Sequence, residues 1–376
     1  MMKLQIACCL LVSSVLIASC RGTSSSAKIW YINRLGTYLP NITVPIGQII
    51  TLECETSQDQ VIVQSPPAHF LEDGKFSPDG SYIVYTSDDD DSRIHLWLAK
   101  QDGSNVKEIA QASDSIRTVW LTNTQLLVLK MNKKYATSWL NDGEAESYDI
   151  LSQQTHPLVL KTNIGLFGKP LVADNQPEKV PLLDQPQVGL AHLKTEGDTV
   201  VQVPDLIFDL SNFAGFSELR FPSLTADGKN LAFVGRLNLH TDQIFLTADN
   251  GRTVNRLTTF EDNYGGVTIF AAGISPNGKW IIFSANLYKR YHPNFPEGVT
   301  TGLLNTESKT VEFLTVQESR GNFAWSPDGR YAAISLVPLG KDPQTTNGEI
   351  HLIDIANRQI KQLTSDGGMK EVIGWR

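Results

Sequence analysis

A four-residue motif that recurs along the chain constrains the fold more than any other feature. Ser-Pro-Asp-Gly, or a close variant, occurs at residues 77–80, 225–228, 275–278 and 326–329. The third residues of the last three copies, Asp227, Asn277 and Asp328, are 50 and 51 positions apart. The gap from Asp79 to Asp227 is 148 positions, which is close to three such periods. A regular period of this length indicates an array of similar structural units.

The chemistry of the motif predicts tight hairpin turns. Proline restricts its own φ angle, while Asp, Asn and Gly tolerate the unusual dihedrals of such turns. An apolar run follows each motif after one or two residues, at 82–85, 231–234, 280–283 and 331–334. We therefore assign a structural role in turns to Pro78, Asp79, Gly80, Asp227, Gly228, Pro276, Asn277, Gly278, Pro327, Asp328 and Gly329.

Each period contains several short β-rich runs separated by turn signals, which predicts a four-stranded meander. Such a meander has two apolar faces and buries both only when copies stack radially around an axis. No run longer than about ten residues shows helical periodicity, so alternating strands and helices are disfavoured. The sequence therefore predicts an all-β fold, a single β-propeller of four-stranded blades.

The spacing also predicts the number of blades and how the ring closes. Starts near residues 76, 120, 172, 224, 274, 325 and 375 indicate seven blades, with six as the alternative because the pattern is weak at 168–220. The last start, Val372–Trp375, has no strands after it. We expect strands near Lys28–Asn33 and Ile49–Cys54 to complete this blade, so that both ends of the chain share it.

The first twenty residues predict an exported lipoprotein. Lys3 precedes an apolar run, Ile6–Ile17, that is too short to span a bilayer and is typical of a signal peptide. The segment ending in Ala18-Ser19-Cys20 resembles the bacterial lipobox, and an ordinary signal peptide with a chance cysteine is the alternative. The domains are then a signal peptide at 1–19, a lipidated Cys20 with a linker to residue 27, and a propeller at 28–376. The resemblance implies acyl chains on Cys20, which anchor the protein.

Arg21, the residue after Cys20, indicates in which membrane the protein is anchored, and the net charge indicates which partners are excluded. Arg21 stands where Asp favours inner-membrane retention, so we expect the periplasmic face of the outer membrane. The net charge is −8 and no basic cluster occurs, which argues against nucleic acid. Cys8 and Cys9 leave with the signal peptide, so Cys54 has no partner for an internal disulfide. We expect a monomeric domain.

The motifs and the strands after them resemble the TolB-type, or WD40-like, propeller repeat over most of residues 70–376. The resemblance implies a fold and not one function, because propellers host many activities. TolB has an α/β domain before its propeller and the prolyl-oligopeptidase group has a hydrolase domain after it, and we expect neither here. Oligogalacturonate lyases have a histidine-rich metal site, whereas the seven His of this chain include no pair spaced like metal ligands.

Catalytic motifs are absent from the sequence. It contains no HExxH, no Walker A motif and no GxSxG. The carboxylate run Asp88–Asp91 is conceivable as a calcium site, but adjacent residues rarely point at one ion, so we interpret the run as a solvated loop. We predict no catalytic residue, metal or cofactor, although an enzyme is not excluded.

The long loops all connect the second and third strands of their units, at 132–146, 286–300 and 337–348, and therefore emerge on one face. Long loops on a rigid scaffold commonly carry function, and aromatic and Arg side chains are typical interface anchors. The alternative is that the rings only pin their own loops. Our candidate binding residues are Tyr135, Trp139, Tyr288, Arg290, Tyr291, His292 and Phe295.

These observations favour a membrane-anchored, non-catalytic propeller that binds or scaffolds another cell-envelope protein or a cell-wall glycan. The first alternative is a glycan-active propeller enzyme, a lyase or glycoside hydrolase, or a glycan-binding module. An enzyme of this kind would need carboxylates or His converging at the central channel. The second alternative is a docking part of a larger machine.

Overall fold

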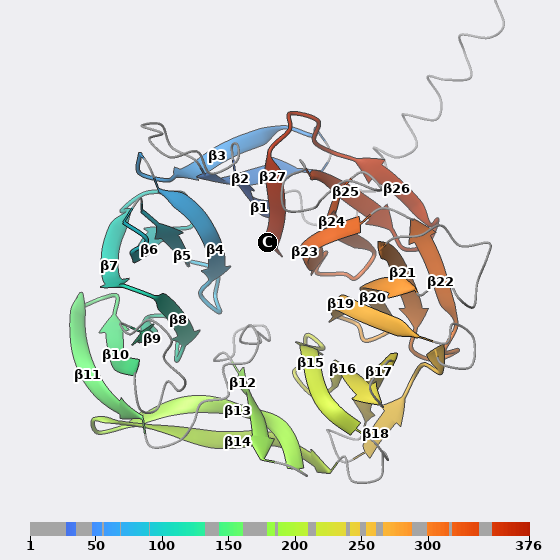
Figure 1. Cartoon of the computed structure of the whole chain (residues 1–376). Helices are drawn as coiled ribbons and strands as arrows, with labels where there is room; N and C mark the ends of the chain where they lie inside the picture. The colour runs from blue at the N-terminus through green and yellow to red at the C-terminus, as the bar shows by residue number, and fades with distance from the viewer. Residues whose placement is uncertain are drawn as a thin grey trace, which may run out of the picture.

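The computed structural model describes residues 28–34, 47–54, 56–67, 69–89, 91–131, 143–160, 179–184, 187–209, 216–237, 241–248, 253–260, 266–287, 299–315, 318–337 and 348–376. Every regular element in these ranges is a β-strand, as the sequence predicts. The sheets stand in a ring around a central opening, the arrangement of a β-propeller (Figure 1). None of the described segments is a helix long and apolar enough to cross a bilayer.

Two sheets are complete four-stranded antiparallel meanders, each with a copy of the motif between its first and second strands. All seven residues of β24 are buried because this strand lies inside its sheet and is covered on both faces. The first sheet contains β4 (Phe70–Phe76), β5 (Tyr82–Asp88), β6 (Ile94–Lys100) and β7 (Lys107–Ala112). The second contains β23 (Glu318–Trp325), β24 (Tyr331–Val337), β25 (Glu349–Asp354) and β26 (Gln359–Gln362).

A third four-stranded sheet combines both ends of the described chain. Its order is β27 (Met369–Trp375), β1 (Lys28–Arg34), β2 (Gly47–Glu53) and β3 (Asp59–Gln64). β1 pairs antiparallel with β27, from Ile29 opposite Trp375 to Arg34 opposite Met369. The closing sheet predicted from the sequence therefore forms from the three expected strands and from β3, which the sequence did not predict.

The remaining strands form two larger sheets, which differs from the separate meanders expected. Short parallel contacts join neighbouring units: Val159 pairs with Thr199, and Thr241 pairs with Val267. One sheet contains β8 (Ser115–Trp120), β9 (Gln125–Met131), β10 (Gly143–Asp149), β11 (Gln154–Leu160), β12 (Lys179–Asp184), β13 (Gln187–Glu196) and β14 (Thr199–Asp209). The other contains β15 (Phe216–Leu224), β16 (Leu231–Leu237), β17 (Thr241–Ala248), β18 (Thr253–Arg256), β19 (Val267–Ile274), β20 (Trp280–Leu287), β21 (Val299–Asn305) and β22 (Val311–Thr315).

The outermost strands β18 and β26 end at Arg256 and Gln362. Just beyond these ends, side-chain hydroxyl groups replace the backbone partners of the ladder. The Thr258 and Thr364 hydroxyls accept hydrogen bonds from the backbone N–H groups of Ile244 and Ile350, each at 2.9 Å.

The repeated motif forms the hairpin turn after the first strand of a unit. Gly80 and Gly278 have φ angles of 78° and 74°, in the left-handed region that favours glycine. The Ser77 hydroxyl donates to Asp79 Oδ1 at 2.6 Å and accepts the backbone N–H of Tyr82 at 3.0 Å. Asp79 Oδ1 also accepts the Ser81 backbone N–H at 3.1 Å. The motif is therefore recurrent because serine, aspartate and glycine together satisfy one turn.

The core lies between adjacent sheets rather than within one layer. Trp120 of β8 is fully buried and packs with Val84 and Leu96 of the preceding sheet. Burying a large apolar side chain contributes about 1.5–3 kcal/mol, so such contacts hold neighbouring sheets together. The inner strands are in this way fixed around the central opening.

Candidate binding site in the central channel

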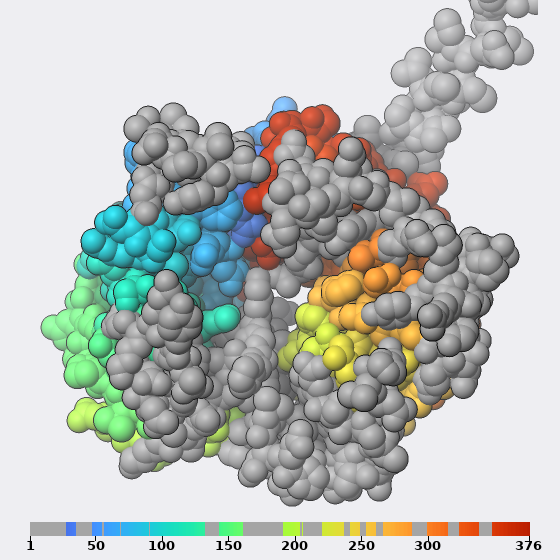
Figure 2. Space-filling model, viewed as in Figure 1, coloured from blue at the N-terminus to red at the C-terminus, as the bar shows by residue number. Residues whose placement is uncertain are grey.

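A cavity of about 920 Å³ lies between the inner strands β4, β8 and β27. It borders the central region of the ring (Figure 2), and we call it the channel cavity. It extends from Ser115, at the start of β8, to Gly80 and Arg376, which follow the ends of β4 and β27.

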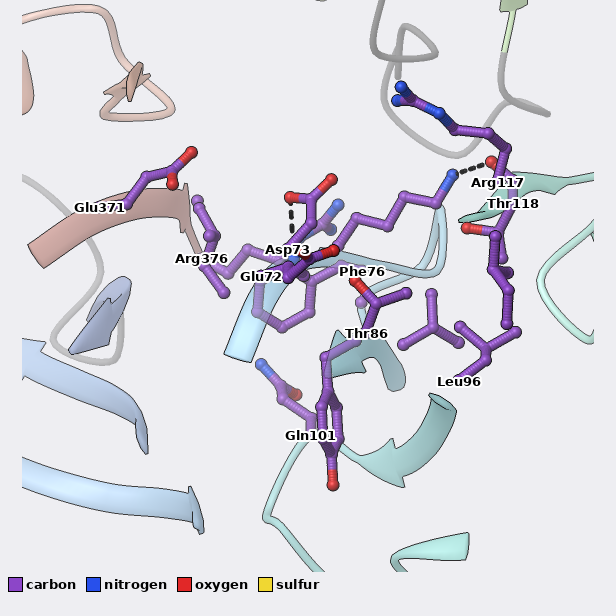
Figure 3. A pocket seen from close by; sticks show the side chains of 18 of the residues that line it. Glu72, Asp73, Phe76, Thr86, Leu96, Gln101, Arg117, Thr118, Glu371 and Arg376 are labelled. Carbon is purple, nitrogen blue, oxygen red and sulfur yellow. Dashed lines mark hydrogen bonds between the residues drawn. The ribbon is translucent and has the colours of Figure 1, made fainter. Parts of the chain in front are cut away.

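The inner strands turn one edge towards the channel. Within the described residues, β4 pairs only with β5 and β8 only with β9. Unpaired strand edges tend to recruit other strands, and here side chains cap them. Lys75 Nζ donates to the carbonyl oxygen of Thr118, as Figure 3 shows, and Trp325 Nε1 donates to that of Gly273 at 3.2 Å. These caps join each inner strand to a neighbouring unit.

Arg34 of β1 connects the closing sheet to the first repeat. Its Nε donates to the carbonyl oxygen of Leu71 at 2.7 Å, and its Nη2 donates to that of Glu72. The same guanidinium forms an ion pair with Glu371 of β27 at 3.2 Å. Three strands from distant parts of the sequence therefore meet at this one side chain.

Glu72 lies at an irregularity in β4 that the sequence does not reveal. The pairing with β5 shifts between Leu71 and Asp73, so Glu72 has no partner in the ladder. Bulges of this kind re-aim side chains and are common beside functional sites. The Glu72 side chain faces the channel cavity together with Arg117 of β8 (Figure 3).

The electrostatic environment of Glu72 is unusual for an exposed carboxyl group. Partial desolvation by the surrounding protein raises its pKa, and the carboxylates of Asp88 and Asp73 add to this effect. The nearby guanidiniums of Arg34 and Arg117 oppose it. No side-chain hydrogen bond to Glu72 or Arg117 occurs in the described part of the chain. Both groups are therefore available to a ligand.

The other end of the cavity is more apolar. The Arg376 guanidinium lies over the Phe76 ring, with its carbon 5.2 Å from the ring centroid, and its Nη1 donates to the carbonyl oxygen of Pro78 at 3.5 Å. Trp30 packs edge-on against Phe76 at 4.9 Å. Here Asp79 takes part in the turn described above. Burial tends to raise its pKa, but hydrogen bonds from Ser77 and Ser81 together hold that pKa below its usual value.

A second polar cluster lies in the sheet β4–β7. His95 contacts Glu108 Oε1 through Nδ1 at 2.9 Å and Asp89 Oδ2 through Nε2 at 3.1 Å. Both ring nitrogens of His95 therefore lie within hydrogen-bond distance of a carboxylate. His69 lies beside it, with ring centroids 4.6 Å apart, and its Nδ1 is 3.0 Å from the hydroxyl of Ser87.

This cluster corrects our interpretation of the carboxylate run Asp88–Asp91. Asp91 is 71% exposed, as expected of a solvated loop, but Asp89 turns inwards to bind His95. The sequence did not reveal this because the contact depends on how the turn between β5 and β6 folds Asp89 back onto His95. Among the described residues, no group of three or more His, Cys, Asp or Glu side chains is arranged to hold a metal ion.

The binding residues predicted from the sequence remain predictions. Cys20 and the seven candidates Tyr135, Trp139, Tyr288, Arg290, Tyr291, His292 and Phe295 lie outside the described residues. Glu72, Arg117 and Glu371 were missed because no motif contains them. The first strands of the other units also contain charged residues, so the sequence offered no signal that singles these three out.

Comparisons with known proteins support the fold. No protein-family model matches the chain, and no curated protein gives a significant match. The chain is similar to the structure of TolB from Acinetobacter baumannii, with 15% identity, 97% of this chain and 71% of that chain covered, and a TM-score of 0.51. It is also similar to the β-propeller domain of the Trilobed protease from Pyrococcus furiosus, with 14% identity, 85% and 90% coverage and a TM-score of 0.50. At these identities the likeness shows a TolB-like β-propeller fold and no activity.

Proposed function

We propose that this chain is a lipid-anchored β-propeller that binds another cell-envelope protein through its central channel. In this proposal the ring has seven blades, and β27 with β1–β3 forms the blade that closes it. Cys20 carries the lipid on the periplasmic face of the outer membrane, and residues 20–27 are the tether. The partner is a protein rather than a nucleic acid, because the chain is acidic, with a net charge of −8.

The observation that carries the proposal is the channel cavity with two charged side chains, Glu72 and Arg117, to which no other side chain forms a hydrogen bond in the described part of the chain. Glu72 and Arg117 face a cavity of about 920 Å³ from adjacent inner strands. Charged groups in a partly desolvated wall gain most from a partner that supplies complementary charges. The strands that hold them are fixed by Lys75 and Arg34, so binding would require little reorganisation.

The test is affinity capture from detergent-solubilised cell envelopes with the tagged lipoprotein. The pocket variant carries Glu72→Gln and Arg117→Gln, and the control variant carries Asp91→Asn and Lys229→Gln at exposed sites outside the cavity. We expect a stoichiometric partner with the wild type and the control, and at least about tenfold weaker capture with the pocket variant. Equal capture by the pocket variant would place binding elsewhere. Alanine at Tyr288, Tyr291 and Phe295 then tests the long loops.

A glycan-hydrolysing activity is the second candidate, and one observation favours it. Glu72 and Glu371 line the same cavity, and desolvation raises the pKa of Glu72. Glycosidases use a pair of carboxyl groups in different environments. If the purified chain depolymerises a cell-wall glycan and Glu72→Gln abolishes this, the binding proposal is replaced by the enzymatic one.

A further inference from the structure

The chain enters the described fold at a defined end of the ring. The backbone N–H of Lys28 donates to the carbonyl oxygen of Arg376, and the N–H of Arg376 donates to that of Lys28 at 2.9 Å. Arg376 in turn contacts Pro78 of the first repeat motif at 3.5 Å. Lys28, the first described residue, therefore lies at the end of the ring that carries the motif turns.

The motif turns share one face with the turns between third and fourth strands. Backbone hydrogen bonds join the two kinds of turn, from Gln101 N–H to Ser81 O at 2.9 Å and from Thr306 N–H to Lys279 O at 3.0 Å. We call this surface the turn face. Its described turns are residues 77–81, 101–106, 121–124, 150–153, 225–229, 275–279, 305–310, 326–330 and 355–358.

The turn face carries two large apolar side chains that the fold leaves exposed. Leu151 is 73% exposed and Val106 is 48% exposed, and each lies in a turn between third and fourth strands. Lys107 Nζ donates to Gln153 Oε1 at 3.0 Å, so the two turns are neighbours. Apolar side chains at loop tips beside a lipid attachment are suited to contact a membrane interface.

We infer that the turn face lies against the lipid bilayer, with Leu151 and Val106 in contact with it, and that the opposite face points away from the membrane. The inference rests on the proposed anchor at Cys20.

The length of the tether supports this orientation. The eight residues 20–27 reach at most about 28 Å at about 3.5 Å each. A seven-residue strand is about 23 Å long at about 3.3 Å per residue. The tether would use nearly all of its length to bring the opposite face to the membrane.

This orientation presents the charged end of the channel cavity to the cell envelope. Glu72 and Asp73 lie in the first half of β4 and Arg117 in the first half of β8, towards the face opposite the motif turns. The second strands β9, β20 and β24 end on that same side, at Met131, Leu287 and Val337. A partner could therefore reach the cavity without entering the membrane interface.

The test uses the full lipoprotein, purified after lipidation and reconstituted into liposomes with an energy-acceptor dye on the lipid headgroups. A donor dye is attached at Lys229→Cys on the turn face or at Asp91→Cys between β5 and β6, which are positions of 64% and 71% exposure. Cys54 is buried and remains unlabelled. We expect higher energy transfer from position 229, and equal or higher transfer from position 91 would overturn the orientation.

A second measurement tests the apolar contact. A polarity-sensitive dye at Leu151→Cys is expected to shift to the blue on liposomes, and the same dye at Val159→Cys, 57% exposed near the far end of the outer strand β11, is expected to stay unshifted. If the blue shift grows with the number of protein molecules per liposome at a constant lipid concentration, it indicates contact between two copies of the protein. This result would overturn the inferred contact with lipid. Flotation of the wild type, compared with Cys20→Ala, reports the anchor separately. Loss of flotation would refute the anchor itself, and the orientation with it.

Discussion

Replacing Lys370 by methionine is expected to destabilise the sheet that closes the ring. The Lys370 side chain is fully buried, and its Nζ contacts Glu349 Oε2 at 3.1 Å and Asp366 Oδ1 at 3.0 Å. It also donates to the carbonyl oxygen of Gly367. Methionine keeps the length of the side chain but removes the charge, so the Glu349 carboxylate, which is only 18% exposed, loses its cation.

The magnitude follows from the burial of the partners. Breaking a buried ion pair by removing one member costs about 3–5 kcal/mol, because the remaining charge is left uncompensated. Asp366 is 51% exposed, so water hydrates its carboxylate when Lys370 is removed. The loss of this ion pair therefore costs less than about 1 kcal/mol. Glu349 keeps the backbone N–H of Gly367 as a donor at 2.9 Å, which moderates the loss. We expect a decrease of about 3–4 kcal/mol in the free energy of unfolding.

The assay is urea unfolding of the mature chain with Cys20→Ala, followed by tryptophan fluorescence. The double variant Lys370→Met with Glu349→Gln should recover a large part of the loss, because it removes the uncompensated charge. Lys229→Met is the matched control, since this lysine is 64% exposed and 4.0 Å from Asp227, and its effect should stay below about 0.5 kcal/mol. A loss below about 1 kcal/mol for Lys370→Met, or no recovery in the double variant, would refute the reasoning.

Two further predictions concern the core and the histidine pair. Gly302→Ala would place a Cβ atom 2.3 Å from Cζ of the buried Phe283 ring, and we expect a loss of about 1–3 kcal/mol in urea unfolding. Gly273→Ala, where the nearest atom is 3.7 Å away, is the control, and equal effects would contradict the prediction. Burial, and next the charge of His95, lower the pKa of His69 in the folded state, so the unfolded state binds more protons below about pH 6.5. Stability should therefore fall as the pH drops from about 6.5 through the lowered pKa. The pKa of His351 is lowered as well, so His69→Gln should reduce this slope without abolishing it, and an unchanged slope would contradict the prediction.

Local chemistry explains why the sequence predicts the strands and turns well. The motif serine, aspartate and glycine interact within five residues, as Ser77, Asp79 and Gly80 do, and alternating apolar runs lie directly beside them. The period of the repeat predicts that Val372–Trp375 is the first strand of a blade shared with the N-terminal strands. Its pairing with β1 needed only the period of the repeat and the β-rich segment after residue 27.

Tertiary structure alone decided which side chains surround the channel. Arg34 and Glu371 are 337 positions apart, and neither lies in a recognisable motif. Glu72 faces the cavity because of a one-residue irregularity in β4, and no sequence pattern encodes such a bulge. The short parallel contacts that fuse the larger sheets are equally non-local. Turn and strand preferences arise from neighbours along the chain, whereas the electrostatics of the cavity arise from groups that meet only when the ring closes.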